Sequence, residues 1–179
     1  MKKAALILAF LIPVWLPAQD PSEELIGWSG SRRLTWADYQ ARPVENSDAA
    51  ASTTTYLMVS YHFSEGDFSF RIESKFSKTR SWGLHKTPYI LAHEQGHFDI
   101  AEIFARKFYK RLKEYRFNRR TYRQDLEKIY QDILDEKEKI QNEYDRQTNH
   151  SINREQQMIW LRKIERWLKE YEDYAGYQD

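Results

Sequence analysis

The segment HEQGH at residues 93–97 has the residue types and the spacing of a catalytic zinc site. On an α-helix, residues four positions apart lie one above the other, so the imidazoles of His93 and His97 can bind the same ion. Glu94 lies one step around the helix, where it can reach a water on that ion but is badly placed as a ligand. The segment therefore matches the H-E-x-x-H pattern, with two imidazoles as zinc ligands and Glu94 as general base.

The residues before and within this segment predict a helix. Thr87 and Pro88 are typical N-cap and first-turn residues, and beyond them only Gly96 interrupts the helical pattern until after Tyr115. A Gly inside a helix costs about 1 kcal/mol relative to Ala. We therefore expect another backbone or a substrate to approach the helix closely at Gly96.

The first twenty residues are typical of a secretory signal peptide. They contain two Lys, an apolar run broken by Pro13, and small residues before a polar one, and they are short for a membrane span. We expect cleavage after Ala18, which removes residues 1–18, although Leu16 is not the small residue that is preferred two positions before Ala18. An uncleaved N-terminal anchor is the alternative. The chain has no Cys, which excludes a lipoprotein anchor and disulfide bonds.

The balance of charged residues bears on the partners that the chain can bind. The chain has 28 Lys and Arg against 27 Asp and Glu, and two of the Lys belong to the predicted signal peptide. A nearly neutral chain gives no indication of nucleic-acid binding. We expect a secreted or periplasmic protein without stable membrane insertion after cleavage.

Two segments near the middle of the chain predict a β-hairpin. Residues 53–63 and 67–76 are rich in β-branched and aromatic residues, alternate in polarity, and are separated by the turn sequence SEGD. Earlier in the chain we expect a loop, with a short strand near Leu34 and a helical turn at residues 36–39. We expect residues 77–88 to form an extended connection leading to the motif helix.

The second half of the chain predicts three long helices. Apolar residues recur every three or four positions from Pro88 onward, at about 122–144 and at about 154–171. These stripes favour mutual packing over a coiled coil with a partner. We predict an α+β fold with a zincin-like HExxH helix, in which an antiparallel β-hairpin or small sheet packs on the three helices. The expected extents are a single domain at 19–179, with its β part at about 28–80 and its helical part at about 87–174.

A catalytic zinc site needs a third protein ligand. His62 in the hairpin is more typical of a structural residue, and His85 before the motif helix could face either substrate or solvent. Glu102 lies nine residues after His93 and five after His97, so on a helix its side chain points away from both imidazoles. A salt bridge with Arg106 is the better interpretation of Glu102.

The polar segment 143–153, predicted as a connection between the second and third helices, supplies the remaining candidates. We expect His150 to be the third ligand, because ligands are often presented on loops held by rigid helices. Asp145 either orients an imidazole or takes the ligand position itself. In the alternative, His150 only caps the turn.

Four segments together resemble one bacterial family. They are LTWADY at 34–39, SW at 81–82, HEQGHFDIAE at 93–102 and YDRQTNHSINREQQMIW at 144–160. The family is known as domain of unknown function 922, and its members are described as secreted zinc-dependent proteases. The resemblance implies the same activity here, and its Tyr-Asp…Thr-x-His block is more specific than the zinc motif. The family pattern has Gly after the His of that block, where this chain has Ser151; the difference concerns a tight turn rather than the ligand.

We therefore predict a zinc metallopeptidase that hydrolyses peptide or protein substrates with Glu94 as general base. Tyr144 is a candidate donor to the oxyanion, although a core tyrosine is the simpler role. The hairpin or residues 77–83 could bind an extended peptide by strand addition. One alternative is a non-catalytic, zinc-stabilised envelope binding module. The other is a helical scaffold in which the motif is accidental.

Overall fold

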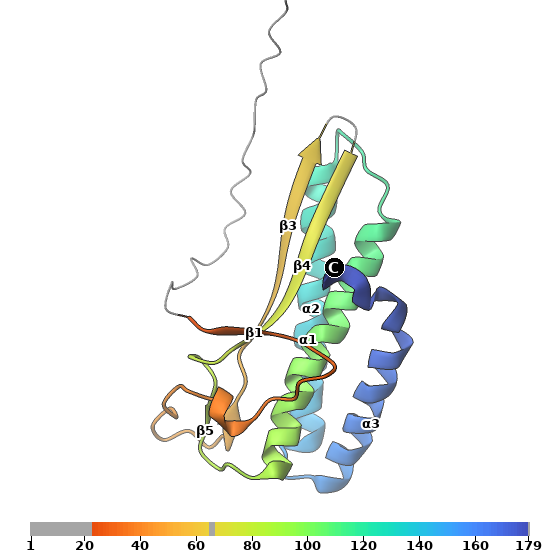
Figure 1. Ribbon diagram of the computed structural model, residues 1–179. Coiled ribbons are helices and arrows are strands. Elements are labelled where there is room, and N and C mark those ends of the chain that lie inside the picture. Colours follow the sequence, from red (N-terminus) through yellow and green to blue (C-terminus); the bar gives the residue numbers. More distant parts are fainter. Residues whose placement is uncertain (1–22, 65–66, 179) are drawn as a thin grey trace, which may run out of the picture.

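The computed structural model describes residues 23–64 and 67–178, so the predicted signal peptide lies outside the described residues. The fold is α+β, with a small antiparallel sheet and three helices (Figure 1). Its strands are β1 (Leu25–Gly27), β2 (Ala51–Ser52), β3 (Thr55–Ser64), β4 (Asp67–Ser77) and β5 (Trp82–Gly83). Its helices are α1 (Pro88–Glu114), α2 (Tyr122–Thr148) and α3 (Arg154–Glu170), with short 3-10 segments η1 (Trp36–Asp38) and η2 (Glu172–Gln178). None of the helices in the described ranges is long and apolar enough to cross a membrane.

The predicted hairpin is confirmed. Strands β3 and β4 pair antiparallel from Thr55 opposite Phe76 to Ser64 opposite Asp67. β1 pairs with the other edge of β4, which gives the strand order β1-β4-β3, and β2 pairs with β5 in a separate two-stranded sheet. The alternation in polarity places Leu57, Val59 and Ile72 in the core.

The N-terminal segment differs from the prediction. The expected strand near Leu34 is wrong, because the strand lies at Leu25–Gly27 instead. Leu34 is buried, and its backbone N–H donates to Gln95 Oε1 on α1 at 2.7 Å rather than to a neighbouring strand. Asp99, one turn further along α1, accepts hydrogen bonds from Trp28 Nε1 at 2.8 Å and Arg33 Nη1 at 3.0 Å. The segment is therefore attached to α1 by side chains. The predicted turn at 36–39 is confirmed as η1.

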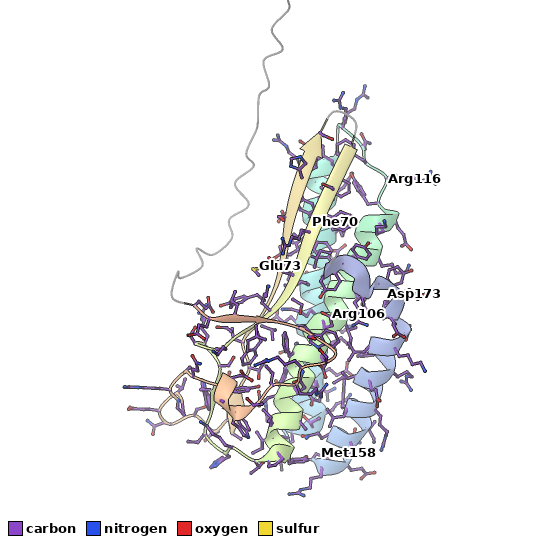
Figure 2. The ribbon with its side chains drawn as sticks, viewed as in Figure 1. Phe70, Glu73, Arg106, Arg116, Met158 and Asp173 are labelled. Carbon is purple, nitrogen blue, oxygen red and sulfur yellow. The ribbon has the colours of Figure 1, made fainter. Side chains whose placement is uncertain are left out.

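Helix α1 is the central element of the fold. The Thr87 side chain accepts the N–H of Ile90, as expected of an N-cap residue, and Pro88 begins the helix. The β-hairpin, α2 and α3 all pack against α1, and α2 also packs against α3, so the three helices cover one another as predicted (Figure 1). The sheet is covered mainly by α1, and Tyr130 of α2 donates to the Leu57 carbonyl of β3 at 3.1 Å. The ion pair predicted between Glu102 and Arg106 is also confirmed, with Arg106 Nε 2.8 Å from Glu102 Oε1. Arg106 is labelled in Figure 2.

The end of α2 lies later than predicted. We expected the helix to stop near residue 144, with 143–153 as a loop, but α2 continues to Thr148. The Thr148 hydroxyl donates to the carbonyl of Tyr144 at 2.7 Å, and Asn149, in a left-handed conformation, terminates the helix. Asp145 therefore lies on the last turn of a rigid helix rather than in a loop. The connection to α3 comprises only residues 149–153.

Candidate metal centre

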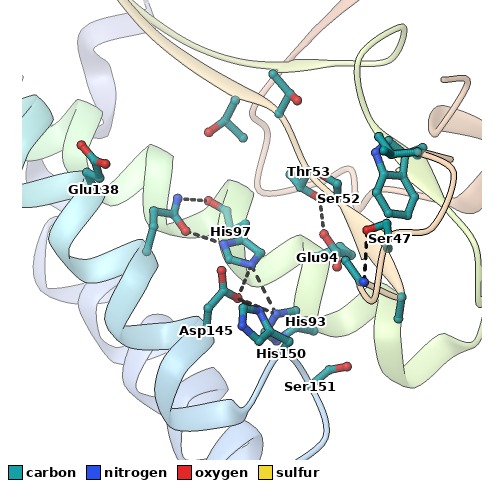
Figure 3. Close-up of a pocket in the computed structure, with 18 of the residues that line it drawn as sticks. Ser47, Ser52, Thr53, His93, Glu94, His97, Glu138, Asp145, His150 and Ser151 are labelled. Carbon is teal, nitrogen blue, oxygen red and sulfur yellow. Dashed lines mark hydrogen bonds and ion pairs between the residues drawn. The ribbon is translucent and has the colours of Figure 1, made fainter. Parts of the chain in front are cut away.

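Three side chains from two helices converge at one end of the fold. His93 and His97 come from the first turns of α1, and Asp145 comes from the last turn of α2 (Figure 3). Asp145 Oδ1 lies 3.1 Å from His93 Nε2 and 3.0 Å from His97 Nε2, and the two Nε2 atoms are 3.3 Å apart. Each of the three residues offers one donor atom, an imidazole nitrogen or a carboxylate oxygen, and among the described residues these atoms form a group that could hold one metal ion.

The three separations fit a tetrahedral zinc ion. With metal–ligand distances of about 2.0–2.2 Å, two ligands of a tetrahedral site lie roughly 3.3–3.6 Å apart. The observed separations of 3.0–3.3 Å between donor atoms lie at the lower end of that range or a few tenths of an ångström below it, so small side-chain shifts would accommodate the ion. Two imidazoles and one carboxylate are also a donor set that suits zinc. The residues that are present therefore fit the ion that the sequence predicted.

The charges of the three groups depend on one another. Burial lowers the pKa of His97, but the adjacent Asp145 carboxylate outweighs it and raises that pKa to about 9. Burial lowers the pKa of His93 despite the same neighbour. Burial would raise the pKa of Asp145, yet hydrogen bonds from the two imidazoles hold it well below its ordinary value. In the absence of metal, the group thus holds an ionised Asp145 and a proton on His97, which a metal ion must displace.

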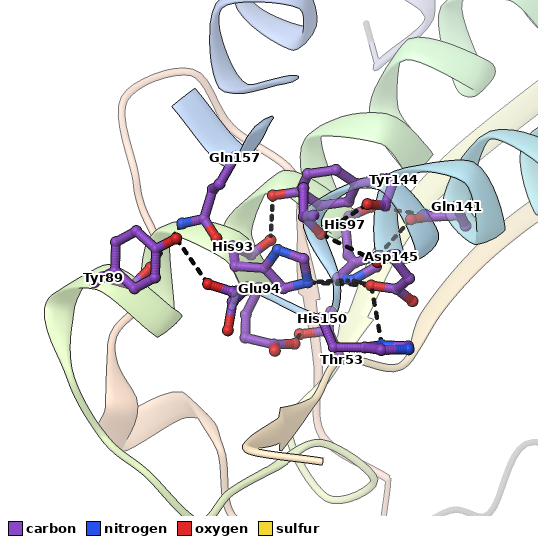
Figure 4. A network of polar contacts seen from close by, with 12 residues as sticks. Thr53, Tyr89, His93, Glu94, His97, Gln141, Tyr144, Asp145, His150 and Gln157 are labelled. Carbon is purple, nitrogen blue, oxygen red and sulfur yellow. Dashed lines mark hydrogen bonds and ion pairs between the residues drawn. The ribbon is translucent and has the colours of Figure 1, made fainter. Parts of the chain in front are cut away.

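Gln141 fixes the orientation of His97. Its Oε1 lies 2.5 Å from His97 Nδ1, and its Nε2 donates to the His97 carbonyl at 2.9 Å (Figure 4). Because His97 Nδ1–H donates to the amide oxygen, Nε2 faces Asp145 and the metal position. Sequence reasoning missed Gln141. The available signal was its position one helical turn before Asp145 on α2.

The Tyr144 side chain packs against the imidazole of His93 and accounts for the presence of glycine at position 96. Its ring stacks on the imidazole of His93, with centroids 4.5 Å apart, and its hydroxyl donates to the His93 carbonyl at 3.2 Å. A Cβ at Gly96 would lie 2.6 Å from this hydroxyl oxygen. The close approach expected at Gly96 therefore exists, but a side chain makes it rather than a backbone or a substrate. The predicted role of Tyr144 as an oxyanion donor stays a prediction, and its hydroxyl is buried against α1.

Glu94 is held by a chain of two hydroxyl groups. Thr53 Oγ1 donates to Glu94 Oε2 at 2.6 Å, and the Tyr39 hydroxyl lies 2.8 Å from the same Thr53 oxygen. Because Thr53 has a single hydroxyl proton, Tyr39 must donate to Thr53. Burial, and then the charge of Glu94, raise the pKa of Tyr39 and keep it a neutral donor. No spacing in the sequence links these three residues, and sequence reasoning missed Thr53 and Tyr39.

The metal group lies on the floor of an open cleft of about 750 Å³ (Figure 3). Residues 49–55 form one wall, which consists of Ala, Ser and Thr. The opposite wall is the cleft-facing side of α2, including Leu134, Lys137 and Gln141. The motif side chains therefore line a cleft that is open to solvent.

His150 lies at the rim of this cleft. Its Nδ1 is 3.8 Å from Asp145 Oδ1, and 69% of its side chain is exposed. Asn149, His150 and Ser151 have φ values of 47°, 49° and 73°, so the chain turns through three consecutive left-handed residues. Tyr89 ties this turn to α1 by donating its hydroxyl proton to the Ser151 carbonyl at 2.7 Å (Figure 4). Ser151 thus makes this turn with a φ that glycine adopts more readily, at the cost of backbone strain.

The structure therefore separates the candidate ligands. It brings Asp145 within ligand distance of both motif imidazoles and leaves His150 beside the group, so the ligand role predicted for His150 stays a prediction. His62 and His85 are exposed and lie outside the group.

Comparison with known proteins gives one match. No curated protein and no solved structure matches the chain. The family model "Bacterial protein of unknown function (DUF922)" matches residues 18–151, a range that includes the metal group, Glu94 and the strained turn. Because this range covers more than half of the sequence, the chain belongs to the DUF922 family of bacterial proteins.

Proposed function

We propose that this protein is a secreted or periplasmic zinc-dependent metallopeptidase. One observation carries the proposal: three donor atoms lie close to the separations of a tetrahedral zinc site, and together with Glu94 they line a cleft. Three protein ligands are typical of catalytic zinc sites, whereas structural sites use four. His93, His97 and Asp145 are the proposed ligands.

Each remaining residue has a definable task in peptide hydrolysis. When bound, zinc supplies a water of lowered pKa and polarises the scissile carbonyl. Glu94 accepts a proton from that water and transfers it to the leaving amine. The Thr53 hydroxyl restricts the rotation of the Glu94 carboxylate, and Tyr39 restricts Thr53 in turn. Gln141 and Tyr144 hold the two imidazoles.

The decisive experiment compares the protein with its Glu94→Gln variant. Both should retain about one equivalent of zinc by mass spectrometry, because Glu94 is not a ligand. Only the parent should cleave a mixed peptide substrate, and the loss in the variant should be at least the roughly 10²–10⁴-fold typical of general-base removal. A variant that keeps full activity would exclude the mechanism.

A zinc-stabilised binding module is the second candidate, and the position of His150 favours it. A rotation of this exposed side chain, 3.8 Å from Asp145 Oδ1 at its nearest nitrogen, would supply a fourth ligand and close the site. The absorption spectrum of the cobalt-substituted protein distinguishes the two candidates. Perturbation of the spectrum by a hydroxamate indicates an open position, and an unresponsive spectrum that changes in His150→Ala indicates a closed one.

A further inference from the structure

We propose that Lys137 binds a carboxylate group of the substrate, and that the cleft therefore selects anionic peptides. This inference rests on the proposed peptidase function and assigns it a class of substrate. It follows from the position of Lys137, from its lack of a charged partner, and from the character of the facing wall.

The position of Lys137 follows from helix geometry. Lys137, Gln141 and Asp145 are spaced four residues apart on α2, so they lie along one face, and all three line the cleft. Eight residues of α-helix span about 12 Å, which separates the Cα atoms of Lys137 and Asp145. Lys137 therefore contacts the same bound molecule as the metal group, but at a distance from the reacting bond.

Lys137 has no carboxylate partner among the residues that the structure describes. It is the single Lys or Arg among the described residues that line the cleft. None of the carboxylates in the described ranges lies within 4.0 Å of its ammonium group, whereas Lys110 and Lys128 have such partners. The side chain is half-buried. Burial lowers the pKa of Lys137, although the adjacent Glu138 opposes that effect.

A half-buried ammonium group without a counter-ion is unfavourable, because the lost hydration is not replaced. A bound carboxylate would replace it. The facing wall, residues 49–55, has no ionisable side chain that would repel an anion. The Ser52 and Thr55 hydroxyl groups of this wall can donate hydrogen bonds to a carboxylate, whereas Thr53 and Thr54 already donate to Glu94 and to the Arg80 carbonyl. Glu138, which also lines the cleft, is exposed at the rim.

The spacing predicts where the anionic group lies in a substrate. An extended peptide advances about 3.3 Å per residue, and the lysine side chain is long, so the carboxylate should lie about two to four residues from the cleaved bond. An acidic side chain or the free C-terminal carboxylate of a peptide can supply the same chemistry. The first source indicates cleavage within acidic segments, and the second indicates removal of short C-terminal pieces.

The test uses quenched fluorescent peptides with a randomised, uncharged background. In one set a single Glu occupies each position in turn, matched by Gln at the same position. In the other set the C-terminus is a free acid or an amide, and no acidic side chain is present. We would measure kcat/KM for the zinc-loaded parent, for Lys137→Met, and for Lys139→Met as the control. Lys139 is exposed on the same helix and does not line the cleft.

At one position, or at the terminus, the parent should cleave the anionic peptide roughly tenfold faster than its neutral match. Lys137→Met should reduce that ratio to about one, while Lys139→Met keeps it. A parent ratio near one or below one at every position, or a ratio unchanged in Lys137→Met, overturns the inference while leaving the peptidase function intact. If no peptide is cleaved, and none binds the Glu94→Gln variant, the peptidase function itself fails.

Discussion

The substitution Gly96→Ala tests whether the packing of α2 against the motif helix maintains the metal site. Alanine favours the helix by about 1 kcal/mol relative to glycine. The added Cβ, however, would lie 2.6 Å from the Tyr144 hydroxyl oxygen and 3.0 and 3.1 Å from two of its ring carbons. Tyr144 is fully buried, so its ring has no free space into which to move.

Overpacking of this kind costs about 1–3 kcal/mol, and displacement of the hydroxyl from the His93 carbonyl costs about 1 kcal/mol more. After subtraction of the helix preference, Gly96→Ala should lower the free energy of unfolding by about 1–3 kcal/mol. Zinc affinity should fall as well, because the Tyr144 ring that would shift is stacked on His93.

Urea denaturation with and without zinc measures both effects. The matched variants are Tyr144→Phe and the double variant Gly96→Ala with Tyr144→Phe. Loss of the hydroxyl removes the shortest contact but leaves the ring carbons, so the double variant should recover part of the stability and not all of it. If Gly96→Ala is as stable as the parent or more stable, the reasoning about this contact is refuted.

Substitutions at three further positions test the third ligand and the turn. Asp145→Ala should lose zinc on dialysis against a weak chelator, with a decrease in affinity beyond the roughly 10–100-fold typical of a group that only orients a ligand; His150→Ala should retain most of its zinc. The opposite order would restore His150 as the third ligand. Ser151→Gly should raise the free energy of unfolding by about 0.5–1 kcal/mol, since glycine adopts a φ of 73° without strain, partly offset by its greater freedom in the unfolded chain. Ser151→Ala, which keeps the strain, should show no gain by urea denaturation.

Local patterns predicted the elements that depend on local interactions. The alternation on both sides of SEGD predicted the hairpin, and Thr87 with Pro88 predicted the start of α1 to the residue. The pattern also identified His93 and His97, because helix geometry alone brings residues four apart onto one face.

Predictions failed where contacts distant in sequence decide the conformation. The sequence around Leu34 predicted a strand, but the Leu34 N–H donates to the side-chain oxygen of Gln95, sixty-one positions away. The polar residues after Tyr144 resemble a loop in sequence, yet α2 continues to Thr148, and its last turn contacts α1 through Asp145 and His93, fifty-two positions apart. That extra turn places Asp145 on the helix at ligand distance from the motif.

The groups that control the reactive side chains come from different elements. Gln141 on α2 orients His97, the ring of Tyr144 on α2 supports His93, and Thr53, between β2 and β3, holds Glu94. The motif itself supplies only two ligands and a carboxylate, which an isolated helix would also present. The third donor and the orienting partners are present only when the segment before the hairpin and the end of α2 are both packed on α1. Metal affinity should therefore depend on the tertiary structure of the whole fold, and a synthetic peptide of residues 87–114 should bind zinc far more weakly than the folded chain.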